Sequence, residues 1–168
     1  MKQTAKDHFV KIIEKHQGII LMLCRTYYPD RQDQEDIRQD IILQLWKSFP
    51  TFRNESKIST WIYKVALHTI LYKIRSEQRK PVHQPLELSL PTKGYDCFTA
   101  DDDLQQLKYF IASLRELDKA IVLLYLEGYQ YKEIGQILEI TATNVSTRLC
   151  RVKNLLKQKY KNIRYDIR

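Results

Sequence analysis

The sequence predicts an all-α protein made of two small helical domains joined by a flexible linker. Only four Gly and five Pro occur among 168 residues, and apolar side chains recur at helical spacing on both sides of one proline-containing segment. Charge divides the chain at the same places: residues 1–80 carry a net +6, residues 81–103 a net −4 and residues 104–168 a net +6. We therefore expect a domain over 1–80, an acidic linker over 81–103 and a second domain over 104–168.

The first domain contains three helical patterns. Apolar residues recur on one face from Phe9 to Tyr27, and they recur again as far as Phe49 in a second helix that Asp33 is expected to cap. The third pattern, from about Ser59 to Arg79, is apolar on more than one side, so we expect a helix buried against several neighbours. We favour a core position over a DNA contact for its Trp61.

The second domain contains two helical patterns separated by a tight turn. In the first pattern an apolar stripe ends at Leu138 and Ile140 closes the turn; Thr141 then stands where an N-cap should, with its hydroxyl placed to accept from the backbone N–H of Asn144. At 100° per residue, one face of the next helix is apolar: Val145, Leu149, Val152 and Leu156. The opposite face is polar: Thr143, Thr147, Cys150, Arg151 and Asn154. The pattern predicts a helix-turn-helix whose second helix can enter a major groove.

The charge of this second helix favours DNA as its partner. Between Asn144 and Tyr165 there are seven Lys or Arg residues and no acidic residue, and phosphates are the natural counter-charge. A lysine-rich surface helix without a ligand is the alternative, but the helix-turn-helix spacing beside the charge favours DNA binding.

Several functional classes lack support in the sequence. Cys24, Cys97 and Cys150 are widely spaced and suggest neither a disulfide framework nor a zinc site. The N-terminus lacks a signal-peptide core, and no apolar run reaches the length of a membrane span. No catalytic triad, P-loop or metal-ligand motif occurs. We expect a cytoplasmic protein that is not an enzyme and has no membrane span, metal site or cofactor.

Two segments resemble a known family. The stretch from Gln34 to Arg75 contains the acidic run QEDIRQD, the pair LW, a Phe-Arg loop, the helix start TWI and a closing Arg, and it resembles the second domain of bacterial sigma factors. The stretch from Leu114 to Lys157 resembles the fourth sigma domain. Both occur in the family's order, so the chain resembles the extracytoplasmic-function (ECF) group of the sigma-70 family, which has only these two domains.

The resemblance implies a sigma factor that binds core RNA polymerase and directs promoter-specific transcription initiation, of a stress or envelope-signal regulon. It implies three partners: the clamp helices of the largest polymerase subunit, promoter DNA both as duplex and as melted single strand, and an anti-sigma factor. The alternative is a helix-turn-helix transcriptional regulator that acts on duplex DNA without being a polymerase subunit. The match from Gln34 to Arg75 favours the sigma factor, because a simple regulator has no need of it.

The resemblance also implies site residues in the first domain. Its acidic helix would dock on the polymerase through Asp33, Glu35, Asp36, Gln39 and Asp40, although such acids also stabilise a helix N-terminus without any partner. A loop would capture a flipped base of the downstream element through Arg53, Asn54, Ser56 and Lys57. The helix after it would follow the same strand with Lys64, His68, Tyr72, Lys73 and Arg75.

In the second domain the resemblance assigns the upstream promoter element to the second helix of the helix-turn-helix. The residues implied there are Thr143, Asn144, Thr147, Arg148, Arg151 and Lys153. In the linker, Asp96 and Asp101 to Asp103 would occupy the RNA exit path, or would simply be solvated charge.

The chain departs from the family pattern at four positions. His68 stands where Asn is usual and Tyr72 where Asp is usual, so contacts made by those residues in the family do not carry over. Gly135 replaces the usual Ala and Glu139 the usual turn Gly. If the turn requires a positive φ at position 139, Glu139 costs stability there.

Overall fold

The computed structural model describes the backbone of residues 2–53, 55–79 and 100–165, and the side chains of residues 5–53, 55–79 and 105–159. Within these ranges the regular structure is entirely helical, which confirms the predicted fold class. The elements are α1 (Lys2–Tyr27), α2 (Arg31–Ser48), the short 3-10 turn η1 (Phe49–Thr51), α3 (Ile58–Gln78), α4 (Ala100–Ala112), α5 (Glu116–Leu126), α6 (Tyr131–Leu138) and α7 (Ala142–Tyr165).

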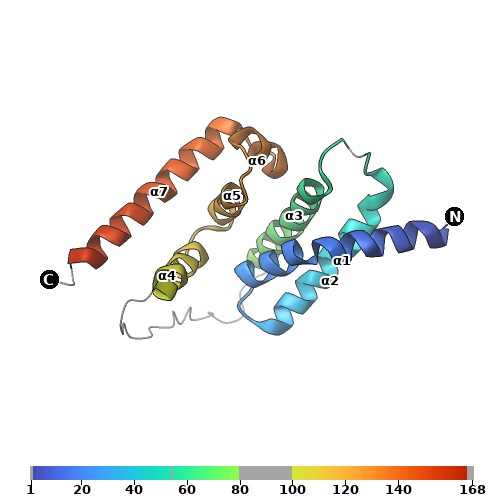
Figure 1. Ribbon diagram of the computed structural model, residues 1–168, viewed down its shortest axis with the longest axis horizontal. Coiled ribbons are helices and arrows are strands. Elements are labelled where there is room, and N and C mark those ends of the chain that lie inside the picture. Colours follow the sequence, from blue (N-terminus) through green and yellow to red (C-terminus); the bar gives the residue numbers. More distant parts are fainter. Residues whose placement is uncertain (1, 54, 80–99, 166–168) are drawn as a thin grey trace.

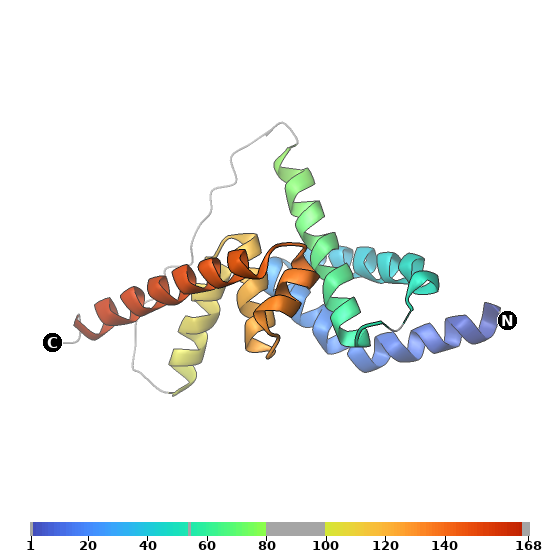
Figure 2. The ribbon, with the colours of Figure 1, turned by 90° about the horizontal axis from the view of Figure 1, so that it is seen from above.

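The helices form two groups that lie side by side. Helices α1, α2 and α3 pack against one another, and α5, α6 and α7 form the second group with α4 against α5 (Figure 1). Seen from above, α5 and α6 lie between α7 and α3 (Figure 2). The first group therefore meets the second mainly through α3.

The first group has a continuous apolar core. Three helices supply fully buried side chains to it: Ile20, Leu23, Ile37, Ile41, Leu45, Ile62, Leu67 and Ile70. Each such side chain contributes about 1.5–3 kcal/mol when removed from water. As predicted, α3 is apolar on several sides, because it packs on α1 and α2 and also on α5 and α6. Trp61 packs against this core while remaining half-buried.

The start of α2 corrects one expectation. Asp30, and not Asp33, is the N-cap: its Oδ1 accepts from the backbone N–H of Gln32 at 2.7 Å and of Asp33 at 3.3 Å. Gln34 strengthens this earlier start, since its Nε2 donates to the carbonyl of Tyr28 at 2.8 Å. Asp33 instead lies in the first turn, where its negative charge favours the helix N-terminus.

The start of α4 corrects a second boundary. The helix begins at Ala100, so residues 100–103 of the predicted linker are helical. The remainder of the predicted linker, residues 81–99 with Asp96, lies outside the described residues.

The two groups contact each other directly instead of standing apart. The hydroxyl of Tyr27 in α1 donates to the backbone carbonyl of Glu116 in α5 at 2.9 Å. The ammonium of Lys119 lies 5.1 Å from the centre of the Tyr27 ring, and burial lowers the pKa of this lysine. Tyr63 of α3 meets Tyr129 edge to face, with ring centres 5.6 Å apart. The domains thus share an interface of aromatic and polar side chains.

Candidate nucleic-acid interface

The loop between η1 and α3 opens onto a surface hollow of about 910 Å³. Five residues predicted to contact the downstream element line it: Arg53, Ser56, Lys64, His68 and Tyr72. The structure therefore brings together side chains from a loop and from three turns of α3. Asn54, also predicted there, lies outside the described residues.

Aromatic rings form one wall of the hollow. Phe52 and Trp61 line it, with ring centres 4.9 Å apart, and the ring centre of Phe49 lies 6.2 Å from that of Trp61. On α3, Tyr72 is 75% exposed, which leaves its ring free to stack on a ligand. Sequence reasoning placed Trp61 in the core, and the structure shows that it serves the core and the hollow at once.

The other predicted downstream residues lie outside the hollow. Lys57 and Arg75 are exposed. The ammonium of Lys73 donates to Oδ2 of Asp40 in α2 at 2.9 Å, and this hydrogen bond raises the pKa of Lys73. A residue predicted to contact DNA is thus paired with one predicted to contact the polymerase.

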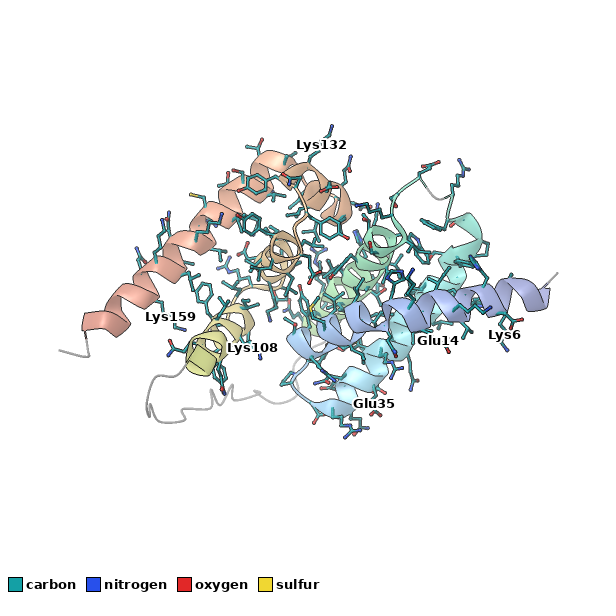
Figure 3. All side chains as sticks on the ribbon, in the orientation of Figure 1. Lys6, Glu14, Glu35, Lys108, Lys132 and Lys159 are labelled. Atoms are coloured by element: carbon teal, nitrogen blue, oxygen red, sulfur yellow. The ribbon has the colours of Figure 1, made fainter. Side chains whose placement is uncertain are left out.

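The acidic face of α2 is open to solvent. Asp33, Glu35, Asp36 and Gln39 are exposed, and Glu35 lies on the side of α2 away from the second helix group (Figure 3). Glu35 also forms an exposed pair with Arg31, whose Nε lies 3.5 Å from its Oε1. The next two turns of α2 expose apolar side chains: Leu43 is 48% and Trp46 41% exposed. The residue-by-residue assignment from sequence did not include these two.

Helix α7 has the two faces that the sequence predicts. Val145, Leu149 and Val152 are buried, whereas Thr143, Asn144, Thr147, Arg151 and Lys153 are exposed. The predicted cap is confirmed, because the Thr141 hydroxyl accepts from the backbone N–H of Asn144 at 3.1 Å. Near the far end of α7, Lys159 points toward α4, 5.7 Å from the ring of Phe110 (Figure 3).

Two basic residues of α7 already have partners within the protein. Arg148 donates through one terminal nitrogen to Oδ1 of Asp118 in α5 and through Nε to Oδ1 of Asn144, both at 2.8 Å. The ammonium of Lys153 lies 4.3 Å above the ring of Tyr125 and 3.1 Å from its hydroxyl. Asp118 and Tyr125 could not be found from sequence, since about thirty residues separate each from its basic partner and no periodic signal links them.

The turn between α6 and α7 has the strain that the sequence indicates. Glu139 adopts φ +57° and ψ +41°, the left-handed conformation that favours glycine. At Gly135, an added Cβ would lie 2.7 Å from the carbonyl oxygen of Ile140, so the absence of a side chain permits the close turn. The turn therefore needs a glycine for space at position 135, four residues before the strained backbone of Glu139.

Glu139 gains a partner in the other helix group. Its carboxylate lies 3.1 Å from the ammonium of Lys64 in α3, and the hydrogen bond from Lys64 lowers the pKa of Glu139. One turn further along α3, Nε2 of His68 lies 3.0 Å from the backbone carbonyl of Ile137. The end of α6 and the turn after it thus contact Lys64 and His68, two residues that line the hollow.

Further chemistry is not indicated in the described part of the chain. Across residues 2–53, 55–79 and 100–165, no cluster of three or more His, Cys, Asp or Glu could hold a metal ion. Cys24 is buried and Cys150 exposed, both as free thiols, and Cys97 falls outside these ranges. None of the described helices has the length and apolar character that crossing a membrane requires.

A two-domain helical fold with a basic helix-turn-helix is that of a DNA-binding protein of transcription. Sequence models of two parts of one family match this chain: Sigma-70 region 2 over residues 12–80 and Sigma-70 region 4 over residues 104–156. The chain belongs to the sigma-70 family, in its ECF group. It is a sigma factor, a protein that binds core RNA polymerase and directs it to promoters, and the family is not one of catalytic enzymes.

Curated relatives align over nearly the whole chain. An ECF RNA polymerase sigma-E factor of Haemophilus influenzae is 25% identical over 173 aligned positions, which cover 95% of this chain and 90% of the relative. The RNA polymerase sigma factor SigV of Bacillus subtilis is 29% identical over 160 positions, which cover 93% of each chain. The two domains are therefore matched in the order and spacing of whole relatives.

Solved structures share the fold. RpoE of Bartonella quintana, determined in complex with the anti-sigma factor NepR, superposes with a TM-score of 0.68 at 17% identity over 92% of this chain and 97% of that one. CnrH, determined in complex with the cytosolic domain of CnrY, gives a TM-score of 0.65 at 16% identity over 96% and 94%. The likeness extends across both helix groups.

Proposed function

We propose that this sigma factor reads its promoter at two points. The hollow beside α3 takes a base of the melted downstream element, and the exposed face of α7 reads the upstream element as duplex. The proposed domains span residues 1–80 and 104–168, and the connector spans 81–103, of which residues 100–103 form the start of α4. The two family matches, over 12–80 and 104–156, support this division.

Downstream capture is supported by the chemistry of the hollow. Arg53 and Lys64 supply positive charge for phosphates, and the exposed Tyr72 supplies a stacking surface. Ser56 can hydrogen-bond the edge of an unpaired base. A volume of about 910 Å³ lies within the range of ligand sites in proteins. Lys57, Lys73 and Arg75 would contact the strand beyond the hollow, and Asn54 belongs to the same proposed loop.

Upstream reading is supported by the orientation of α7. Thr143, Asn144 and Thr147 lie exposed in its first two turns, where a docked helix reaches base edges. Arg151 is exposed on the same side and suits a phosphate, and Lys153 continues the basic face beside Tyr125. Arg148 lies between them but is engaged by Asp118.

Polymerase docking is assigned to the open face of α2. Asp33, Glu35, Asp36 and Gln39 are exposed there, with Asp40 half-buried at its edge. The exposed Leu43 and Trp46 extend this face with apolar area, and an acidic rim around apolar anchors suits a basic coiled coil such as the clamp helices.

The wider role follows from these surfaces. The protein would act in the cytoplasm as a polymerase subunit without catalytic activity of its own, on a stress or envelope-signal regulon. An anti-sigma factor is a proposed partner, because the two solved neighbours were determined with an anti-sigma factor or a cytosolic protein domain bound.

A single observation carries the proposal: five side chains expected from sequence to bind a melted strand gather around one hollow. A regulator acting only on duplex DNA would not require such a site. The test is run-off transcription from a genomic promoter library by core RNA polymerase, with and without this protein. We expect new start sites that disappear when Arg53 and Lys64 are both changed to Ala. Failure to bind core polymerase together with an unchanged set of start sites would contradict the proposal.

A further inference from the structure

A hydrogen-bonded chain of three side chains runs from the core side of the second domain to the exposed face of α7. The carboxylate of Asp118, in the first turn of α5, holds a terminal nitrogen of Arg148 at 2.8 Å, and Nε of Arg148 donates to Oδ1 of Asn144 at 2.8 Å. The side chain of Asp118 is 13% exposed and that of Arg148 29%, whereas Asn144 is exposed. The chain thus connects a nearly buried charge to a residue on the helix face proposed to read DNA.

The hydrogen bond from Arg148 fixes which end of the Asn144 side-chain amide faces outward. A guanidinium has only donors, so Asn144 must present its carbonyl oxygen to Arg148. The backbone N–H of Asn144 is also occupied, because it donates to the Thr141 hydroxyl at 3.1 Å. The carbonyl oxygen can accept a second hydrogen bond, but it is turned toward Arg148, so the amide NH₂ group, which is a donor, is the end left for a ligand. The Asn144 amide would therefore meet DNA with its NH₂ group outward and not with its carbonyl outward.

Arg148 is held strongly enough to keep that orientation on DNA. A phosphate could compete for its guanidinium, but taking it would leave the Asp118 carboxylate nearly buried without its partner. Because Asp118 is nearly buried, leaving it without its partner costs more than an exposed phosphate contact returns. Arg148 consequently stays with Asp118 and acts through Asn144 instead of contacting the backbone itself.

We propose that Asp118 and Arg148 are positioning residues that hold Asn144 with its amide donor toward the upstream element, selecting against cytosine at the base it faces. This inference rests on the proposed docking of α7 in the major groove. There guanine offers N7 and O6 as acceptors, adenine N7 and thymine O4, whereas cytosine offers an amino donor. The usual pairing of Asn with adenine needs the carbonyl and the NH₂ group at the base edge together, and here the carbonyl is turned toward Arg148.

Two substitutions change the base preference in opposite ways. Arg148→Met removes the donor at similar length, frees the Asn144 carbonyl and should move the preference at one position toward adenine by about tenfold. Asn144→Asp keeps one oxygen for Arg148 and presents the other as an acceptor, so the same position should move toward cytosine. Asn144→Ala should abolish selection at that position and thereby identify it.

The experiment selects duplex promoters, randomised over the upstream element, with holoenzyme reconstituted from core RNA polymerase and the full-length chain. Arg25→Met, an identical chemical change on an exposed part of α1, should leave the selected sequences unchanged. Because Arg148→Met leaves Asp118 unpaired, the double variant Asp118→Asn with Arg148→Met is included, and thermal unfolding of each variant is measured. The double variant should show the same shift toward adenine.

The outcomes separate this inference from the function it rests on. If the wild type selects no upstream sequence at all, the proposed role of α7 fails and the inference falls with it. If Asn144→Ala changes one position but the folded Arg148 variants select the wild-type base there, the positioning role alone is overturned. A wild-type preference for cytosine at that position would overturn it as well.

Discussion

Nε2 of His68 in α3 lies 3.0 Å from the backbone carbonyl oxygen of Ile137 in α6, and this contact joins the two domains of the protein. A carbonyl can only accept, so Nε2 carries the hydrogen. His68 stands where the family usually has Asn, and here its ring contacts the end of α6 in the other domain from the helix proposed to bind the melted strand. Together with the pair between Lys64 and Glu139, it shows that part of the hollow is engaged within the protein itself.

Removing the charge of Glu139 should strengthen binding of single-stranded DNA. The Glu139→Gln variant no longer neutralises Lys64, which lines the hollow, and an exposed pair of this kind is worth about 0.2–1 kcal/mol. We expect affinity for a single-stranded oligonucleotide to rise by a factor of about two to five, measured by fluorescence anisotropy. Glu14→Gln, an equal charge change at an exposed site on α1, is the control. An equal gain in both variants would assign the effect to net charge alone.

Alanine at position 135 should destabilise the helix-turn-helix. The added Cβ would lie 2.7 Å from the carbonyl oxygen of Ile140, and backbone must move to admit it. We expect the free energy of unfolding to fall by about 1–3 kcal/mol, measured by urea denaturation followed by circular dichroism. Gly18→Ala is the matched control, because nothing lies within 4 Å of a Cβ added at Gly18. Alanine is also the better helix former by about 0.5–1 kcal/mol. A Gly135→Ala variant as stable as the wild type would refute this account of the turn.

Arg151 should contribute to upstream DNA binding without contributing to folding. Arg151 is exposed on α7, so Arg151→Ala should weaken duplex binding. The slope of log affinity against log salt concentration should become shallower by about one unit, the value for one lost phosphate contact. Val145 is fully buried in the same helix, and Val145→Asp should unfold the domain. Binding isotherms at several salt concentrations, together with circular dichroism, test both. Equal duplex binding by the wild type and Arg151→Ala at physiological salt would exclude the contact.

Lys119 should make the free energy of unfolding depend on pH in the alkaline range. Burial lowers the pKa of its amine below the ordinary 10.5, although Glu116 partly opposes this effect. Between the lowered value and 10.5 the unfolded chain binds more protons than the folded one, so the free energy of unfolding rises with pH in that window. Lys119→Met should lack this rise. Burial also raises the pKa values of Tyr27, Tyr28 and Tyr63, which contribute an opposite slope above their ordinary 10.0 in both proteins. The difference between the urea midpoints therefore reports Lys119 together with its contact with Tyr27.

The features predicted from sequence are those that local patterns encode. The faces of α7 and the Thr141 cap follow from helical periodicity and from one hydroxyl at a helix start, and both are confirmed. The predicted N-cap of α2 was wrong because two Asp residues stand three positions apart, and the structure shows that Asp30 makes the capping hydrogen bonds. Local rules rank both as good caps.

Contacts between segments distant in the chain could not be predicted from the sequence. The engagement of Arg148 by Asp118 and of Lys64 by Glu139 depends on how helices pack, which no spacing rule encodes. The family pattern identified Glu139 as unusual, but the partner that compensates for its strained backbone lies 75 positions earlier in the chain. Whether the site residues bind promoter and polymerase stays a prediction that the experiments above test.

The bond between Lys73 and Asp40 makes the two proposed binding surfaces interdependent. A polymerase group that draws Asp40 away releases the Lys73 ammonium for a phosphate, and a strand that takes Lys73 releases Asp40 in the same measure. Because linkage is reciprocal, each ligand changes the affinity of the other by the same factor. A single ion pair between α2 and α3 would thus give cooperativity between polymerase docking and strand capture, without any movement of the backbone.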